Sequence, residues 1–165
     1  MSTPTLVRPL SLRVLLLAAP PIFVAHFLEE APGFVPWFNA HVARGITAPL
    51  FWSVNYTALA ITLGVVTVEW LSGTTLSAAL VVGWLGCLMF ANALFHLAGA
   101  LVDGGYVPGL ATALLLYLPF FGAVVAHVVR TRRLSRGGAA AAALLGALPM
   151  LAHGYLILFR GSRLF

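Results

Sequence analysis

The sequence contains no lysine, a single cysteine and few charged residues of either sign. Only 8% of its 165 residues are charged, whereas 61% are hydrophobic and the mean hydropathy is +1.02. These values lie far outside the range of soluble domains, so we expect an integral membrane protein. The single cysteine, Cys87, excludes an intrachain disulfide and a cysteine-rich metal site. All nine basic residues are arginines in a few clusters, unlike the basic stripe of a nucleic-acid-binding protein.

Five apolar runs are long enough to cross the roughly 30 Å hydrocarbon core of a bilayer. They cover residues 11–30, 50–70, 76–101, 109–129 and 139–159. Glycine, proline and arginine residues mark the turns, and the sequence shows no internal repeat and no soluble domain. We interpret the alanine-rich start of the fifth run as a tightly packed membrane helix. The predicted fold is therefore all-α, a single transmembrane domain over residues 1–165 that forms a bundle of about five helices.

The arginines gather on one side of these alternating spans. That side carries Arg8, Arg13, Arg130, Arg132, Arg133 and Arg136, and the opposite side carries Arg44, Arg160 and Arg163. The positive-inside rule then places the N-terminus in the cytoplasm and the C-terminus outside. A competing interpretation makes the first run a signal peptide cleaved after residues 23–25. The Pro20-Pro21 pair in that run is expected to kink the first span.

Several polar residues lie inside the apolar runs, at similar depths. They are His26, Glu29, Glu30, Asn55, Asn92, His96 and His153. The first three are spaced i, i+3 and i+4, and Asn92 and His96 are spaced i and i+4, so each set shares one face of a helix. A rise of 1.5 Å per residue puts the two asparagines and the three histidines within roughly 7–14 Å of the same membrane face. We expect them to converge on one site.

Two neighbouring carboxylates near hydrocarbon are costly, since one charged acid at the centre of a span costs roughly 2.5–3.5 kcal/mol. Protonation, a histidinium partner or a bound cation would each offset this cost. Imidazoles together with carboxylates match the donor sets of zinc, iron and manganese sites, although the spacing differs from that of zinc peptidases. The predicted ligands of a divalent metal are His26, Glu29, Glu30, His96 and His153, with Asn92 as an orienting group.

Simpler roles are expected for other polar residues. Asn55 fits a hydrogen bond between helices, and Asp103 fits a cap or a solvated turn before glycines. Residues 36–45 predict a short interfacial helix whose aromatic side chains enter the bilayer while His41 faces water. We expect this segment to be an anchor, with a lid over the site as the alternative.

The motif HFLEE at residues 26–30 has the form His-x-x-Glu-Glu. With the downstream Asn92 and His96, it resembles the HXXEE-domain family of small bacterial membrane proteins, which also has a characteristic asparagine and histidine. The resemblance spans roughly residues 20–160, and Asn55 is a competing match for the asparagine. It implies a multi-pass protein of the bacterial inner membrane and supplies no activity.

The residues favour a membrane-embedded enzyme whose site opens near the outer leaflet. Metal-activated water, with the spare glutamate as general base, predicts hydrolysis of a lipid, an isoprenoid or another apolar small molecule. The predicted catalytic residues are Glu29, Glu30, His96 and Asn92. Two alternatives stay open: a metal-independent acid/base isomerase or cyclase, and a carrier or sensor of a cation or proton. We expect no nucleic-acid partner, and association of identical chains into a homo-oligomer stays open.

Overall fold

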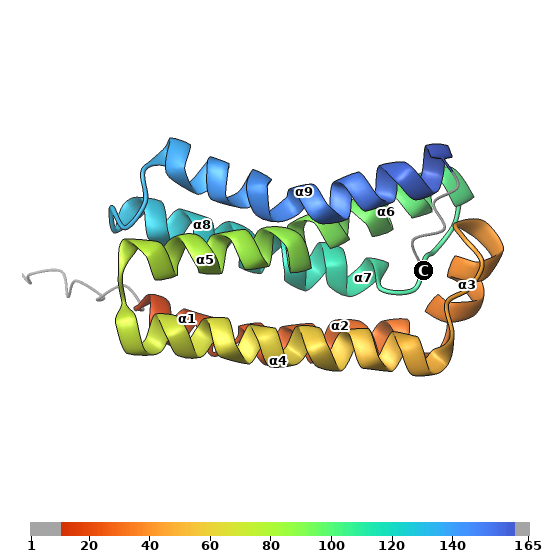
Figure 1. Ribbon diagram of the computed structural model, residues 1–165, viewed down its shortest axis with the longest axis horizontal. Helices are drawn as coiled ribbons and strands as arrows, with labels where there is room; N and C mark the ends of the chain where they lie inside the picture. Colours follow the sequence, from red (N-terminus) through yellow and green to blue (C-terminus); the bar gives the residue numbers. More distant parts are fainter. Residues whose placement is uncertain (1–10, 161–165) are drawn as a thin grey trace, which may run out of the picture.

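A computed structural model describes residues 11–160, with side chains through Tyr155, and this part of the chain is helical with no strand. Five segments are long and apolar enough to cross a membrane: Leu12–Glu30, Ala48–Ser72, Thr75–Asp103, Leu110–Arg130 and Arg136–Tyr155. They form a bundle in which the first span begins at one end and the fifth finishes at the other (Figure 1). The predicted all-α bundle of five helices is confirmed. Arg8 and Arg163, used above to orient the chain, lie outside the described residues.

The first span consists of two helices. α1 (Leu12–Leu16) ends in a turn, and α2 (Ala19–Glu30) begins with Pro20 and Pro21 in its first turn. Proline is tolerated there because the N–H groups of the first turn have no partner within the helix. The proline pair therefore starts a new helix, where we expected a kink in a continuous one.

The remaining elements follow in chain order. They are α3 (Phe34–His41), α4 (Ala48–Ser72), α5 (Thr75–Leu85), the π-helix η1 (Gly86–Ala91), α6 (Asn92–Asp103), α7 (Leu110–Thr112), the π-helix η2 (Ala113–Tyr117), α8 (Leu118–Arg130) and α9 (Arg136–Arg160). The third span, made of α5, η1 and α6, contacts the second, fourth and fifth spans, so it lies at the centre of the bundle.

Small residues let α9 approach the third span closely. A Cβ atom on Gly146 would lie 1.8 Å from the carbonyl oxygen of Gly83, and one on Gly86 would lie 2.7 Å from that of Ala143. Such backbone contact is typical of membrane helices with small residues at their interface. The alanine-rich segment therefore packs as the sequence predicts.

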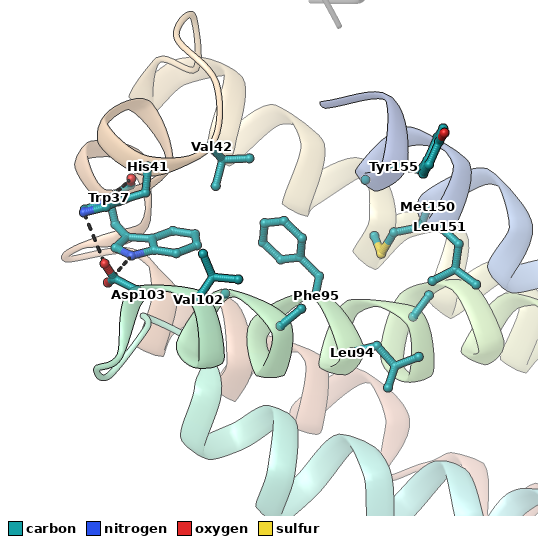
Figure 2. A pocket seen from close by; sticks show the side chains of 14 residues that line it. Trp37, His41, Val42, Leu94, Phe95, Val102, Asp103, Met150, Leu151 and Tyr155 are labelled. Carbon is teal, nitrogen blue, oxygen red and sulfur yellow. Dashed lines mark hydrogen bonds and ion pairs between the residues drawn. The ribbon is translucent and has the colours of Figure 1, made fainter. Parts of the chain in front are cut away.

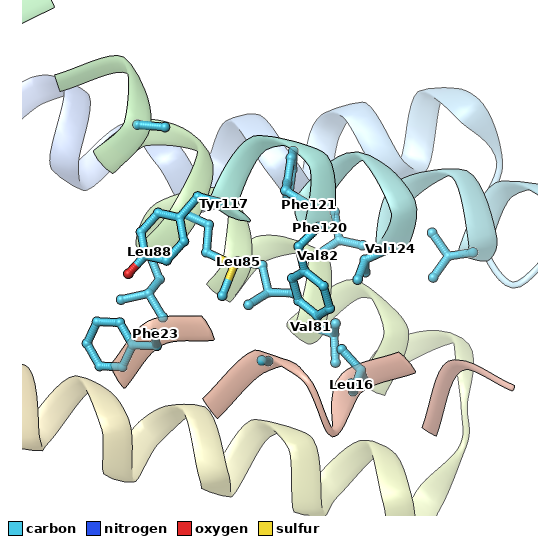
Figure 3. Packing of buried hydrophobic residues seen from close by; sticks show 14 of the residues in the cluster. Leu16, Phe23, Val81, Val82, Leu85, Leu88, Tyr117, Phe120, Phe121 and Val124 are labelled. Carbon is cyan, nitrogen blue, oxygen red and sulfur yellow. The ribbon is translucent and has the colours of Figure 1, made fainter. Parts of the chain in front are cut away.

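The interior of the bundle is apolar over the length of α5 and α8. The buried side chains there come from α2, α5 and α8 and pack in one cluster, which includes Phe23, Leu85, Phe120 and Val124 (Figure 3). In a bilayer these side chains leave lipid and not water when the helices associate, so close packing holds them together. This core separates the two polar regions at the ends of the bundle.

A buried ion pair lies at the end where α4 meets α5. Glu69 is fully buried, and its two carboxylate oxygens accept hydrogen bonds of 2.8 and 3.0 Å from Arg133, which lies between α8 and α9. Ser77 donates a third bond of 2.6 Å to the same carboxylate. The pair connects the second, third and fourth spans and satisfies the charge of Glu69 inside the bundle.

α3 covers the opposite end of the bundle. The indole nitrogen of Trp37 donates to Asp103 Oδ2 at 3.1 Å, and His41 Nε2 lies 3.4 Å from Asp103 Oδ1 (Figure 2). Asp103 is the last residue of α6, so these contacts fasten α3 to the third span. Asp103 therefore makes a tertiary contact, whereas we expected it to cap a helix or to lie in a solvated turn.

Candidate metal centre

Three buried side chains from two helices meet near the end covered by α3. His26 and Glu30 lie one turn apart on α2, and His96 comes from α6, with exposed fractions of 1%, 5% and 0%. Glu30 Oε1 lies 3.5 Å from His26 Nε2 and 3.1 Å from His96 Nε2. One donor atom from each residue lies within 4.8 Å of the others. The structure thus brings together three of the predicted metal ligands, which we call the His26–Glu30–His96 cluster.

Thr112 hydrogen-bonds the ring of His26. Its hydroxyl oxygen lies 2.8 Å from His26 Nδ1 and 3.3 Å from the carbonyl oxygen of Gly109. When the hydroxyl donates to that carbonyl group, it accepts from His26 Nδ1–H, and the neutral imidazole then has a lone pair on Nε2. In that tautomer the lone pair faces an oxygen of Glu30 at 3.5 Å, and a cation between the two atoms would turn repulsion into attraction. A bond from Nδ1–H is the usual support of a metal-bound histidine.

Other polar atoms around the cluster lack partners. His96 Nδ1 and the hydroxyl of Tyr117 are buried without a hydrogen bond from any side chain or backbone group that the structure describes. The Tyr117 ring packs on His26 with a centroid separation of 4.1 Å. Each unpaired buried group costs about 1–3 kcal/mol. A bound ion with a ligand in its remaining position would remove several of these costs together.

Two of the three donor separations in the cluster fit a divalent metal. Zinc binds histidine nitrogen and carboxylate oxygen at about 2.0–2.1 Å, and tetrahedral geometry then separates neighbouring donor atoms by about 3.3 Å. The two separations from Glu30 Oε1, 3.1 and 3.5 Å, bracket that value. Two imidazoles and one carboxylate are a donor set of catalytic zinc sites and also suit iron and manganese. The set leaves one coordination position for water or substrate.

The backbone at Gly109 covers the cluster. A Cβ atom there would lie 2.7 Å from His96 Cε1 and 3.0 Å from both Glu30 Cγ and His26 Cε1. Its φ of +93° also belongs to the left-handed region that favours glycine. The chain entering α7 therefore lies directly against all three side chains and shields them from solvent.

Glu29 points away from the cluster, although it is adjacent to Glu30. Its carboxylate accepts hydrogen bonds from the amides of Ala111 at 3.0 Å and Thr112 at 2.8 Å, and from the hydroxyl of Tyr106. The bond to Glu29, with a smaller contribution from burial, raises the pKa of Tyr106 to about 12. Glu29 thus fixes the start of the fourth span and with it the threonine that bonds His26. The structure does not bring Glu29 to the predicted metal.

Three further predicted or competing residues line a separate apolar cavity of about 180 Å³. They are Asn55, Asn92 and His153. Asn55 donates to the carbonyl oxygen of Phe51 at 3.0 Å, a bond within its own helix, whereas we expected one between helices. His153 lies outside the cluster, and within the described part of the chain no contact places Asn92 in an orienting role toward His96. Phe34 lines this cavity and lies 6.0 Å from the His96 ring between centroids, so an aromatic ring adjoins both sites.

Sequence reasoning missed the contribution of residues 109–117. Gly109, Thr112 and Tyr117 all touch the cluster, yet none belongs to the motif or shares a helix with it. The available signal was a threonine and a tyrosine inside an apolar run directly after a Pro-Gly turn. Polar groups in such a run mark functional positions by the same reasoning that singled out His26.

The profile of a family described as "Protein of unknown function with HXXEE motif" matches residues 17–125. The match covers more than half of the chain, so the chain belongs to this family. It includes the whole His26–Glu30–His96 cluster and ends before His153. No curated protein and no protein of known structure matches the chain significantly.

Proposed function

We propose that this member of the HXXEE family is a membrane-embedded, metal-dependent enzyme that hydrolyses a lipid, an isoprenoid or another apolar small molecule. His26, Glu30 and His96 would hold zinc, ferrous iron or manganese. The observation that carries the proposal is the convergence of three buried donor residues, with Glu30 Oε1 3.5 Å from His26 Nε2 and 3.1 Å from His96 Nε2. In a bacterial inner membrane, with the N-terminus of the chain in the cytoplasm, the cluster lies near the outer leaflet.

The residues around the cluster divide the remaining tasks. A divalent metal held there would supply Lewis acidity to activate water or polarise a substrate oxygen. Thr112 hydrogen-bonds His26 Nδ1 and so orients the ring, and Glu29 holds the Thr112 backbone in place. Tyr117 offers a buried hydroxyl that can donate a hydrogen bond to a substrate oxygen. Glu29 is already engaged with three donors, so the general-base role predicted for a spare glutamate is not part of this proposal.

The surroundings favour an apolar substrate. The 180 Å³ cavity beside His96 is lined mainly by phenylalanine and aliphatic side chains, and a larger cavity of about 490 Å³ adjoins it. Apolar pockets with a few placed polar groups are the usual form of small-molecule sites. Phe34 lines the smaller cavity, and its ring lies 6.0 Å from the His96 ring between centroids, so rotation of its side chain would bring the cavity closer to the cluster.

A metal-independent acid/base isomerase or cyclase is the second candidate. The observation in its favour is that one carboxylate, Glu30, contacts two imidazoles and can exchange a proton with either. A cation or proton carrier is less well supported, because apolar side chains fill the interior between the cluster and Glu69 (Figure 3). At the far end, Glu69 is engaged with Arg133.

Metal content tests the first part of the proposal. Detergent-purified wild-type protein, loaded with zinc, manganese or ferrous iron and desalted, should retain about one equivalent of one metal by elemental analysis. Glu30→Gln and His26→Ala should lose it. His153→Ala is the control, which should retain it because its side chain does not reach the cluster. Wild-type protein that retains no metal would overturn the metal site and leave the acid/base candidate.

The reaction class is tested with isotopes. A bacterial lipid extract incubated with metal-loaded protein in H₂¹⁸O should yield products two mass units heavier than those formed in ordinary water, because hydrolysis adds one oxygen from water. Glu30→Gln should form none. Metal-free protein that forms products of the same mass as the substrate in H₂¹⁸O, and deuterium-labelled products in D₂O, would instead support isomerisation.

A further inference from the structure

One end of the bundle carries many more arginines than acids. α1, the end of α8 and the start of α9 lie there, beside the turn between α4 and α5 (Figure 1). The arginines that the structure describes at this end are Arg13, Arg130, Arg132, Arg133 and Arg136. Among the described residues, Glu69 is the only acidic side chain there, because the other three acids of the sequence lie at the end with the His26–Glu30–His96 cluster.

One of these arginines already neutralises Glu69. Both carboxylate oxygens of Glu69 accept hydrogen bonds from Arg133. The other four arginines are exposed, and none of them forms an ion pair within the part of the chain that the structure describes. We call them the unpaired arginines: Arg13, Arg130, Arg132 and Arg136. Their positive charges therefore need a counter-charge from outside the described protein.

Arg132 occupies a backbone position that favours glycine. Its φ is +56°, and no other non-glycine residue in the described part of the chain has a positive φ. The Arg132 amide donates to the carbonyl oxygen of Val129 at 3.1 Å, and the Arg133 amide donates to that of Val128 at 2.9 Å, so α8 ends in a Schellman motif. Glycine is usual at this position because it has no Cβ atom. An arginine held in this strained conformation points to a function for its side chain.

The fold holds the unpaired arginines at the level of the membrane surface. Arg130 is the last residue of the fourth span and Arg136 is the first of the fifth. Arg13 Nη2 lies at the turn between α4 and α5, 2.9 Å from the position that a Cβ atom on Gly73 would take. Arg133 donates to the carbonyl oxygen of Thr74 in the same turn, which fastens the turn between α8 and α9 to it. Basic residues at the ends of spans lie among lipid headgroups.

We infer that the unpaired arginines bind the phosphate group of an anionic phospholipid in the leaflet at this end of the bundle. A guanidinium group offers two parallel N–H donors, which match a pair of phosphate oxygens. Each arginine near the membrane surface contributes about fivefold in affinity for an anionic lipid. The site lies at the opposite end from the His26–Glu30–His96 cluster and requires no metal, so it goes beyond the proposed function.

Native mass spectrometry of detergent-purified protein measures this binding one lipid at a time. The measurement does not depend on the orientation in which the chain was inserted into the membrane. Wild-type protein should bind dioleoyl phosphatidylglycerol at least about tenfold more tightly than dioleoyl phosphatidylcholine, whose headgroup has no net charge. Equal affinity for the two lipids would overturn the inference. Displacement of phosphatidylglycerol by an equal concentration of inorganic phosphate would overturn it too, since the ligand would then be a free anion and not a lipid.

Arg132→Gly is the most informative variant, because its effects on stability and on binding have opposite signs. Removing the side chain relieves the backbone, so the melting temperature of lipid-free protein should rise. The affinity for phosphatidylglycerol should fall about fivefold. An Arg132→Gly protein that binds this lipid like wild type would contradict the inference.

Further variants separate this site from general charge and from the metal centre. Arg130→Gln combined with Arg136→Gln should lower the affinity for phosphatidylglycerol about twenty- to thirtyfold. Arg44→Gln removes an exposed arginine at the opposite end of the bundle and is the matched control, which should bind like wild type. Glu30→Gln should also bind like wild type, which separates this result from a failure of the metal proposal. An equal loss of affinity in Arg44→Gln and in the double variant would show attraction to net charge alone and overturn the site.

Discussion

Placing an alanine at Gly109 should distort the cluster, whereas the same change at Gly104 should not. Both glycines have positive φ, +93° and +71°, so each substitution incurs the left-handed penalty of about 1–2 kcal/mol. At Gly104 the new methyl meets no atom within 4 Å. At Gly109 it would lie within 3.0 Å of all three cluster side chains, and such overpacking adds about 1–3 kcal/mol. Gly109→Ala should therefore cost about 2–5 kcal/mol and Gly104→Ala about 1–2 kcal/mol.

The assay is reversible unfolding in mixed micelles, followed by a metal-binding titration against a chelating dye. The difference between the two variants isolates the contact with the cluster, because the strain of the backbone is common to both. Metal affinity should fall at least about tenfold in Gly109→Ala, the range seen when support of a metal ligand is lost, and stay at the wild-type level in Gly104→Ala. Equal losses of stability and equal metal affinity in the two variants would refute the contact described between the Gly109 backbone and the cluster.

Three further outcomes are expected. Tyr117→Phe should raise the free energy of unfolding of the metal-free protein by about 1–3 kcal/mol, because it removes a buried hydroxyl without a partner, and micelle unfolding checks this. Arg133→Met should lower that free energy by about 3–5 kcal/mol, and Glu69→Met combined with it should restore most of the loss; a double variant as unstable as Arg133→Met would contradict the ion-pair argument. The hydrogen bond from Tyr106 to Glu29 raises the pKa of the Tyr106 hydroxyl. The stabilisation that this bond gives the folded state is therefore fully present below pH 10 and is lost as pH rises through about 12. The melting-temperature difference between wild type and Tyr106→Phe should therefore be constant below pH 10 and shrink above it.

The spans were predictable because apolar runs of membrane length leave little choice of fold. The division of roles between Glu29 and Glu30 was not. Helical spacing puts both acids near His26, but the rotation of α2 against α6 decides which one meets His96. The partners of Glu29 come from Ala111 and Thr112, about eighty residues along the chain, and no periodicity links them to the motif.

Tertiary packing explains why some of the predicted site residues lie outside the cluster. His153 has the expected depth, but the position of α9 places it at the smaller cavity and not at the cluster. Asn55 has the expected depth as well, and its amide bonds its own helix. Depth along a span is readable from sequence, whereas direction around the bundle depends on how close neighbouring helices approach.

The π-helix η1 makes the cluster depend on the number of residues in the third span as well as on their kinds. A π turn takes up one extra residue without turning the helix beyond it, whereas each residue added to a regular α-helix turns it by about 100°. The same number of residues wound as regular α-helix from Gly86 to Ala91 would rotate His96 by about a quarter of a circle away from Glu30. The span would still be long and apolar enough to insert, and the HFLEE motif would be intact. A relative could therefore keep every named residue of the motif and lose the site by losing the π turn in an apolar stretch.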